Sequence, residues 1–242
     1  MPLLTVENLT PTHGLLHAVR GVDLALAEGE TLALVGANGA GKTTLLRTIA
    51  GAHRAALGRI RFDGADITLL PAHRRVPLGI ALVPEGRRLF AGMTVAENLL
   101  VAEGRGRAGR WTMATVLDAF PQLRPKLKSR AGDLSGGQQQ AAAIARALMS
   151  NPRLLLLDEV SLGLSPAAVD QLYASLAALP AGGTTIVLVE QDLGRALGVA
   201  DRVVCLLEGR ITYEGRARET TRARVLEAYF GVSSALGAGA DR

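Results

Sequence analysis

One segment combines glycines, a lysine and threonines at a spacing that suits phosphate binding. It follows the apolar residues 31–35 and reads Gly36, Ala37, Asn38, Gly39, Ala40, Gly41, Lys42, Thr43 and Thr44. Glycines let successive backbone N–H groups point at one anion, and a helix that starts here adds a partial positive charge. In such a loop the lysine reaches the β- and γ-phosphates, and the first threonine hydroxyl is a ligand for Mg²⁺. The segment predicts a site for ATP and Mg²⁺.

A second glycine-led segment opens a strongly helical stretch. It reads Leu134, Ser135, Gly136, Gly137 and Gln138. The free N–H groups at a helix start attract anions. One nucleotide has one terminal phosphate, so two such segments in one chain predict that two chains close around the ligands. Each chain would lend its second segment to the nucleotide of the other.

Two acidic residues follow an uninterrupted apolar run. The run at residues 154–157 lacks polar alternation, as a strand covered on both faces does, and it ends at Asp158 and Glu159. Asp158 is suited to hold Mg²⁺, directly or through water, because this ion prefers oxygen ligands. Glu159 is suited to orient and partly deprotonate an attacking water.

A similar apolar run at residues 186–189 ends at Glu190 and Gln191. Ligands of open parallel sheets bind at the carboxyl ends of the strands. We therefore expect this strand end, the Asp158 strand end and the phosphate loop to meet at one edge of a sheet.

The elements that position these residues alternate between strands and helices. Strands are predicted at residues 3–8, 20–26, 30–35, 58–62, 79–83, 153–157, 184–189, 202–207 and 210–214. Helices are predicted at residues 42–50, 166–179, 192–199 and 219–230, and residues 93–150 are mostly helical. Gly51 is placed to end the first of these helices. We expect one domain over residues 1–231, with the helical lobe inserted in it, and a mobile tail at residues 232–242.

Composition limits the other classes of protein. The chain has 242 residues, a net charge of +5 and 3% aromatic residues, and Cys205 is its one cysteine, so it has no internal disulfide framework. No apolar run approaches the roughly 20 residues of a membrane helix, and Glu7 and Asn8 stand where a secretory signal would be apolar. The arginine-rich residues 104–110 favour a solvated linker over a nucleic-acid site, because no aromatic residues interleave.

The order of these motifs resembles the nucleotide-binding subunit of ATP-binding-cassette (ABC) transporters over nearly the whole chain. The motifs are the phosphate loop, Leu-Ser-Gly-Gly-Gln and Leu-Leu-Leu-Leu-Asp-Glu. The resemblance implies an α/β fold: a P-loop NTPase (RecA-like) core with a mainly parallel sheet, an N-terminal antiparallel β region and a helical lobe that carries the Leu-Ser-Gly-Gly-Gln signature. It also implies a head-to-tail dimer in which Ser135, Gly136 and Gly137 of one chain contact the γ-phosphate held by the other, with Gln138 part of the same binding segment.

Five positions depart from the usual pattern of that family. Glu85 stands in place of a glutamine, Gln191 in place of a histidine and Val160 in place of a proline. The loop at residues 161–164 lacks the usual aspartate, and His13 stands where an aromatic residue stacks on adenine.

Several of these departures resemble one branch of the family, the second ATPase subunit of branched-chain amino acid importers. The shared stretches are Val-Pro-Glu-Gly-Arg-Arg, Ser-Leu-Gly-Leu, Val-Glu-Gln and the Glu-Ala-Tyr-Phe-Gly of residues 227–231. Val160 and His13 are particular to this chain.

The unusual side chains lead to specific expectations. Glu85 is expected either to offer an oxygen near Mg²⁺ or to be a solvated loop acid. His13 is expected either to stack on adenine or to be an ordinary turn histidine. Gln191 can hydrogen-bond a γ-phosphate but cannot carry a proton at neutral pH. We expect slower or less pH-dependent hydrolysis than in histidine-bearing relatives. Phe90 lies in a region that meets the membrane subunit in this family, or else packs locally.

The resemblance implies an ATPase at the cytoplasmic face of the membrane, bound peripherally. It would power import of branched-chain amino acids or similar small polar solutes through separate transmembrane permease subunits, with a solute-binding protein acting indirectly. The second cassette would be identical or a related subunit, and no nucleic acid is expected. Two alternatives remain: a soluble ABC ATPase outside transport, and a regulatory nucleotide-binding module that does not hydrolyse.

Overall fold

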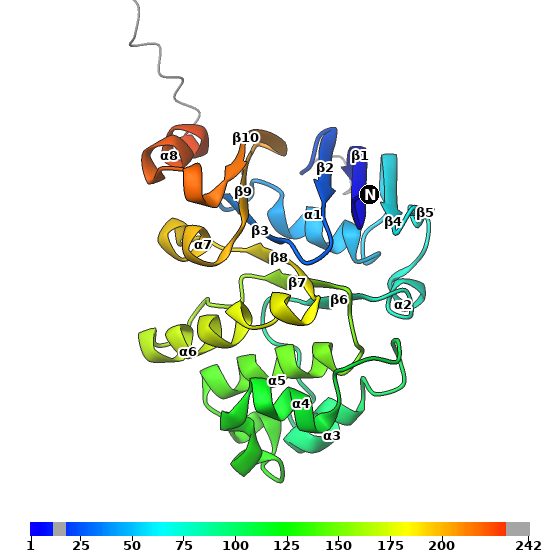
Figure 1. Ribbon diagram of the computed structural model, residues 1–242, viewed down its shortest axis with the longest axis vertical. Helices are drawn as coiled ribbons and strands as arrows, with labels where there is room; N and C mark the ends of the chain where they lie inside the picture. The colour runs from blue at the N-terminus through cyan, green and yellow to red at the C-terminus, as the bar shows by residue number, and fades with distance from the viewer. Residues whose placement is uncertain (12–17, 231–242) are drawn as a thin grey trace, which may run out of the picture.

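Two β-sheets and a group of helices make up the described residues, 1–11 and 18–230, of this computed structural model (Figure 1). The strands are β1 (Leu4–Pro11), β2 (Val22–Leu26), β3 (Thr31–Gly36), β4 (Ala55–Phe62), β5 (Ala65–Asp66), β6 (Ile80–Val83), β7 (Leu154–Asp158), β8 (Thr185–Val189), β9 (Arg202–Leu207) and β10 (Arg210–Arg216). The helices are α1 (Lys42–Ile49), α2 (Ala72–Arg75), α3 (Val95–Leu100), α4 (Met113–Ala119), α5 (Gly136–Leu148), α6 (Pro166–Ala177), α7 (Leu193–Val199) and α8 (Arg222–Phe230). Short 3-10 helices lie at Pro121–Lys126, Ala131–Asp133, Pro180–Gly182 and Ala217–Glu219.

The N-terminal antiparallel sheet has the order β2-β1-β4-β5. β4 begins at Ala55, three residues before the predicted start, because β1 pairs with it as far as Pro11 opposite Ala55. β5 and α2 were not predicted, and both are too short to leave a periodic pattern in the sequence.

The second sheet has the order β10-β9-β3-β8-β7-β6, in which only β10 runs antiparallel to its neighbour. Gly36, at the end of β3, pairs with Leu206, and Asp158, at the end of β7, pairs with Val189. The parallel strands β3, β8 and β7 are adjacent and end on the same side of the sheet. The prediction that the phosphate loop and the two polar strand ends lie at one sheet edge is therefore confirmed.

The apolar run of β7 is buried on both faces of this sheet. Leu154 and Leu156 pack into the core between the two sheets and α1, whereas Leu155 and Leu157 pack against the core that holds α5 and α6. All four leucines are inaccessible to solvent, and each contributes about 2 kcal/mol by burial. This two-sided burial explains the absence of polar alternation and fixes Asp158 at the edge of the sheet.

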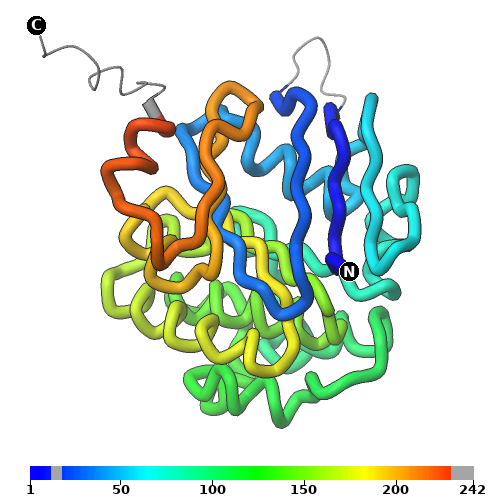
Figure 2. The backbone as a smooth tube through the Cα atoms, turned by 45° about the horizontal axis from the view of Figure 1, so that its top comes forward, coloured from blue at the N-terminus to red at the C-terminus, as the bar shows by residue number. Residues whose placement is uncertain are grey.

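The helices α3, α4 and α5 form the lobe drawn in green, at the end of the molecule opposite the antiparallel sheet (Figures 1 and 2). Each begins with a capping box, formed by Thr94 with Glu97, Thr112 with Thr115 and Ser135 with Gln138. Local side chains thus fix where these helices start. Within the described residues, every helix is too short or too polar to cross a membrane.

Candidate functional site

The phosphate loop between β3 and α1 requires glycine at two close approaches of the backbone. Gly36 has φ +148° and Gly41 has φ +103°. A Cβ on Gly36 would lie 2.2 Å from the carbonyl oxygen of Leu206, and one on Gly41 would lie 2.1 Å from that of Ala18. The loop therefore turns tightly against neighbouring backbone, and it leads into α1, whose first amides have no acceptor within the helix.

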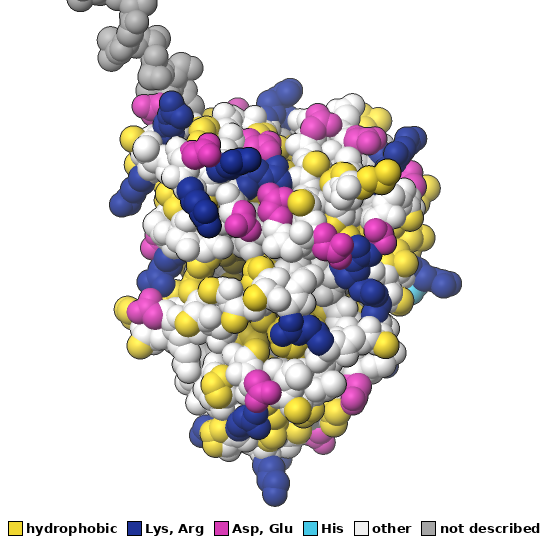
Figure 3. Space-filling view, in the orientation of Figure 1, with side chains coloured by type: hydrophobic (Ala, Val, Ile, Leu, Met, Phe, Trp, Pro, Cys, Tyr) yellow, Lys and Arg dark blue, Asp and Glu magenta, His cyan; other side chains and the backbone are white. Residues whose placement is uncertain are grey.

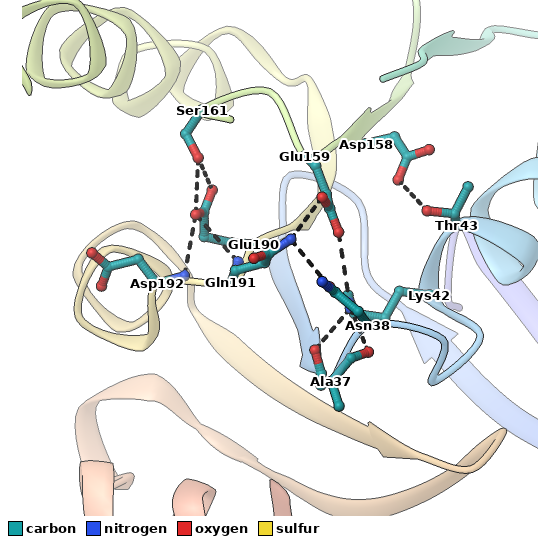
Figure 4. Close-up of polar contacts among 11 residues, drawn as sticks. Ala37, Asn38, Lys42, Thr43, Asp158, Glu159, Ser161, Glu190, Gln191 and Asp192 are labelled. Carbon is teal, nitrogen blue, oxygen red and sulfur yellow. Dashed lines mark hydrogen bonds and ion pairs between the residues drawn. The ribbon is translucent and has the colours of Figure 1, made fainter. Parts of the chain in front are cut away.

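Lys42 is the buried cation of this loop, with 4% of its surface exposed. Its Nζ donates to the carbonyl oxygens of Gly36 and Ala37 at 2.8 and 2.9 Å and lies 4.0 Å from Oε1 of Glu159 (Figure 4). Burial lowers the pKa of Lys42, and the charges of Glu159 and Asp158 oppose that shift. The ammonium group of Lys42 is thus held in place, and its positive charge is only partly balanced by nearby acidic side chains. This arrangement suits it to bind phosphate oxygens.

Thr43 and Asp158 form a pair suited to Mg²⁺. The hydroxyl of Thr43 donates to Oδ1 of Asp158 at 2.8 Å, whereas Oδ2 of Asp158 is buried and has no hydrogen-bond partner. Burial raises the pKa of Asp158, and the charge of Glu85 adds to this shift. An orphaned carboxylate oxygen beside a hydroxyl fits a hard cation that completes its shell with phosphate and water oxygens. Asp158 and Thr43 would hold the ion.

Glu159 and Gln191 face each other across the ends of β7 and β8. Nε2 of Gln191 donates to Oε2 of Glu159 at 2.8 Å and to Oδ1 of Asn38 at 3.3 Å (Figure 4). Glu159 has φ +49°, a left-handed conformation that costs on the order of 1 kcal/mol or more in a non-glycine residue. This strained backbone directs the carboxylate toward Lys42 and Gln191 instead of continuing the strand.

Lys42, Thr43, Glu159 and Gln191 line one pocket of 530 Å³. Its walls are Ala18, Asn38, Gly39, Gly41, Lys42, Thr43, Thr44, Glu85, Glu159, Leu162 and Gln191. Glu85 lies two residues after β6, lines this pocket and is exposed there. Ala40 belongs to the same loop and is buried, its N–H donating to the carbonyl of Ala37. His13 lies outside the described residues.

The signature residues lie at the start of α5 and do not line this pocket. Ser135 Oγ accepts from the N–H of Gln138 at 3.4 Å, and Oε1 of Gln138 accepts from the N–H of Ser135 at 3.2 Å. The side chains of Ser135 and Gln138 thus cap the helix, and the N–H groups of Gly136 and Gly137 have no acceptor within it.

Sequence reasoning gave no role to three polar residues behind the pocket. Glu190 is buried and accepts hydrogen bonds from Ser161 and Tyr173. A carboxylate at the end of an apolar strand was visible in the sequence. Its partners were not, because Ser161 and Tyr173 belong to other elements.

Comparison with known proteins gives a consistent result. Residues 19–161 match the family described as ABC transporter. The chain is 42% identical to the high-affinity branched-chain amino acid transport ATP-binding protein BraG of Pseudomonas aeruginosa, covering 95% of this chain and 100% of that protein. It is 37% identical to the probable branched-chain amino acid transport ATP-binding protein LivF of Archaeoglobus fulgidus, covering 90% and 93%.

Solved structures resemble the fold over almost all of the chain. A nucleotide-free ATP-binding cassette from an ABC transporter has a TM-score of 0.84 and 28% identity, covering 95% of this chain and 99% of that one. A dimeric cassette in a post-hydrolysis state, bound to ADP and Pi, has a TM-score of 0.77 and 25% identity, covering 90% and 100%. The chain belongs to the ABC transporter family and is one of its ATP-binding cassette ATPases.

Proposed function

We propose that this ATPase powers import of branched-chain amino acids, or similar small polar solutes, through separate permease subunits at the cytoplasmic face of the membrane. The observation that carries the proposal is the convergence of Lys42, Thr43 and Glu159 on one pocket, with Asp158 hydrogen-bonded to Thr43, together with the 42% identity to a branched-chain amino acid transport protein. A nucleotide-binding module without hydrolysis would not need a carboxylate on a strained backbone beside the loop lysine.

Each side chain has a role in this proposal. The loop at residues 36–44 binds the phosphates of ATP, and Lys42 balances their charge. Mg²⁺, when bound, neutralises phosphate charge and orients the terminal phosphate. Glu159 accepts a hydrogen bond from the attacking water and takes its proton as the water oxygen bonds to the γ-phosphorus. The bond between that phosphorus and the β–γ bridging oxygen breaks in the same step, and ADP is the leaving group. The Gln191 amide holds Glu159 in orientation and can turn toward the γ-phosphate.

The signature helix supports a composite site made by two cassettes. Ser135 is exposed, and the first residues of α5 do not line the nucleotide pocket of their own chain. In the proposal these amides bind the γ-phosphate held by a second cassette, and Leu162, 53% exposed at the rim of the pocket, is covered by that partner. The second cassette is either another copy or a related subunit.

A separate groove of 300 Å³ supports docking of a permease helix. It lies between β6 and the helical lobe, and its lining includes Val83, Phe90, Val101 and Arg146. Phe90 is 51% exposed although the guanidinium of Arg146 lies 5.6 Å from its ring centroid. An apolar groove with an exposed aromatic residue is a feature of protein-binding surfaces.

The alternative of a nucleic-acid partner gains no support from the charge distribution on the face in Figure 3. Acidic and basic side chains are interspersed there and do not gather into one basic stripe. A protein that binds the phosphate backbone of a nucleic acid needs such a concentration of positive charge.

Turnover by the purified protein tests the proposal. Wild type should release phosphate from ATP in the presence of Mg²⁺, and Glu159→Gln should lose roughly 10²-fold or more of that rate while still binding ATP. The Glu159→Gln variant should pair with itself or with a companion cassette in saturating Mg-ATP, as measured by sedimentation. A wild-type protein that binds ATP without turnover, or a variant that stays unpaired both alone and in the mixture, contradicts the proposal.

The membrane partners need a second measurement. Mass spectrometry of the proteins that co-purify with the tagged chain from detergent-solubilised membranes should identify permease subunits and a companion ATPase. Phe90→Asp should reduce the permease yield and leave ATP binding unchanged. Recovery of ribosomal or DNA-bound proteins instead would favour the soluble alternative.

A further inference from the structure

A buried carboxylate joins the two catalytic loops from behind. Glu190 follows β8 and is 3% exposed. Its oxygens accept hydrogen bonds from the Ser161 hydroxyl at 2.9 and 2.8 Å, and Oε1 also accepts from the backbone N–H groups of Gln191 and Asp192, both at 3.2 Å (Figure 4). Ser161 lies two residues after Glu159, so one side chain bonds both loops.

Tyr173, on α6, anchors this carboxylate to a rigid element. Its hydroxyl donates to Oε2 of Glu190. Burial raises the pKa of Tyr173, and the charge of Glu190 and this hydrogen bond raise it further, so the phenol keeps its proton and acts as the donor. Arg195 lies over the ring of Tyr173 at 5.9 Å and pairs with Asp170 and Asp192 at 3.3 Å each. The four donors satisfy Glu190 as a buried anion without a direct ion pair.

The two loops are also joined by the hydrogen bond from Gln191 to Glu159. A cavity of 250 Å³ is lined by residues of both loops, among them Glu159, Ser161, Glu190 and Gln191. The pairing of β7 with β8 fixes where both loops begin, at Asp158 and Val189, and beyond that point the hydrogen bonds of Glu190 join the loops on this side. The contact between Gln191 and Glu159 lies directly in front of this network.

We infer that Glu190 is a positioning residue for ATP hydrolysis: anchored by Tyr173, its carboxylate holds the loop of Glu159 and Ser161 against the loop of Gln191 and so sets the orientation of the Glu159 carboxylate. This inference rests on the proposed function, since it assigns a supporting role to a residue of the same site. Glu190 itself does not touch the nucleotide pocket.

Two variants test the inference, and one serves as a matched control. Glu190→Gln keeps the shape of the side chain but turns one acceptor into a donor, and Tyr173→Phe removes only the hydroxyl. Both should lower kcat roughly 10- to 100-fold, as loss of an orienting group does, and change the KM for ATP less than about 2-fold. Tyr213→Phe removes a hydroxyl that bonds Thr220 far from the site and should leave both constants unchanged.

A double-mutant cycle separates positioning from general stability. If Glu190 acts through Gln191 and Glu159, adding Glu190→Gln to a Gln191→Ala protein should cost much less activity than it does in wild type. Additive losses, an unchanged kcat in Tyr173→Phe, or a rise in KM with unchanged kcat would overturn the inference. If the wild-type protein hydrolyses ATP and one of these results is found, the inference about Glu190 is wrong and the proposed function stands. If the wild-type protein does not hydrolyse ATP, the proposed function itself is contradicted.

Discussion

The side-chain amide of Gln191 donates a 2.8 Å hydrogen bond to the carboxylate of Glu159 and a 3.3 Å hydrogen bond to Oδ1 of Asn38. One neutral side chain thus links the strand end that carries the acidic pair to the phosphate loop. An amide holds this geometry at any pH near neutrality, because it does not titrate. A histidine at this position would change its charge over that range.

Gln191→His should therefore change both the rate and the pH dependence of hydrolysis. The imidazole can become a cation beside Glu159, so we expect faster turnover. We also expect a new pH-dependent step at about pH 6.5, which is the ordinary pKa of histidine. The wild-type rate should vary less over that interval. Steady-state phosphate release between about pH 5.5 and 8 measures this, with Gln191→Ala as the control. Identical rates and profiles in wild type and Gln191→His would show that this position does not set the pH response.

Asp158→Asn should separate stability from magnesium binding. A carboxyl with a raised pKa binds its proton more tightly in the folded state, so stability falls as pH rises above about 4, and the ionised Asp158 destabilises the fold at pH 7. The nucleotide-free variant should be at least as stable as wild type in urea. Its stabilisation by Mg-ATP should largely disappear, because an amide oxygen is a poorer ligand for Mg²⁺.

Asp118→Asn provides the control for that measurement, since Asp118 is exposed and pairs with Arg124 at the surface. It should keep the full stabilisation by Mg-ATP. A strongly destabilised Asp158→Asn protein would show that the carboxylate is needed for the fold itself.

Gly41→Ala and Gly39→Ala should differ in stability. Both glycines have positive φ, +103° and +82°, but a Cβ on Gly41 would lie 2.1 Å from the backbone of Ala18, whereas one on Gly39 would meet nothing within 4 Å. Gly39→Ala should lose about 1 kcal/mol from backbone strain alone, and Gly41→Ala should lose more than about 3 kcal/mol. Urea unfolding of the nucleotide-free proteins measures both. Equal losses would contradict the close approach at Gly41.

Arg75→Met should destabilise the fold without touching the nucleotide. The guanidinium of Arg75 is 1% exposed and donates to the carbonyls of Thr48 and Ile49 at 2.9 and 2.8 Å, at the end of α1, and to those of Leu70 and Thr68 at 2.7 and 3.0 Å. Burial lowers the pKa of Arg75 to about 10. Removing the donors should cost roughly 2–4 kcal/mol of the free energy of unfolding.

The neighbouring Arg74 is exposed and provides the comparison. Arg74→Met should change the free energy of unfolding by less than about 0.5 kcal/mol. Chemical denaturation checks both variants, and a similar small effect of Arg75→Met would mean that water can replace the guanidinium.

The sequence alone determined the phosphate loop, the acidic pair, the signature segment and the family. These features are local, since a strand, a turn and a helix start are each encoded within a few adjacent residues. The leucines of β7 predicted a strand buried on both faces, and the structure confirms it. The short elements β5 and α2 escaped prediction because their form depends on pairing with β4 and packing near Gly51.

Only the tertiary structure decided which side chains meet. β3 lies between β8 and β9, which are more than a hundred residues away in the chain, and this order brings Gln191 to Asn38 and Glu159. The network of Glu190 likewise joins three separate elements. Contacts of this kind depend on strand order and register, which come from burial of the whole core and leave no local pattern in the sequence.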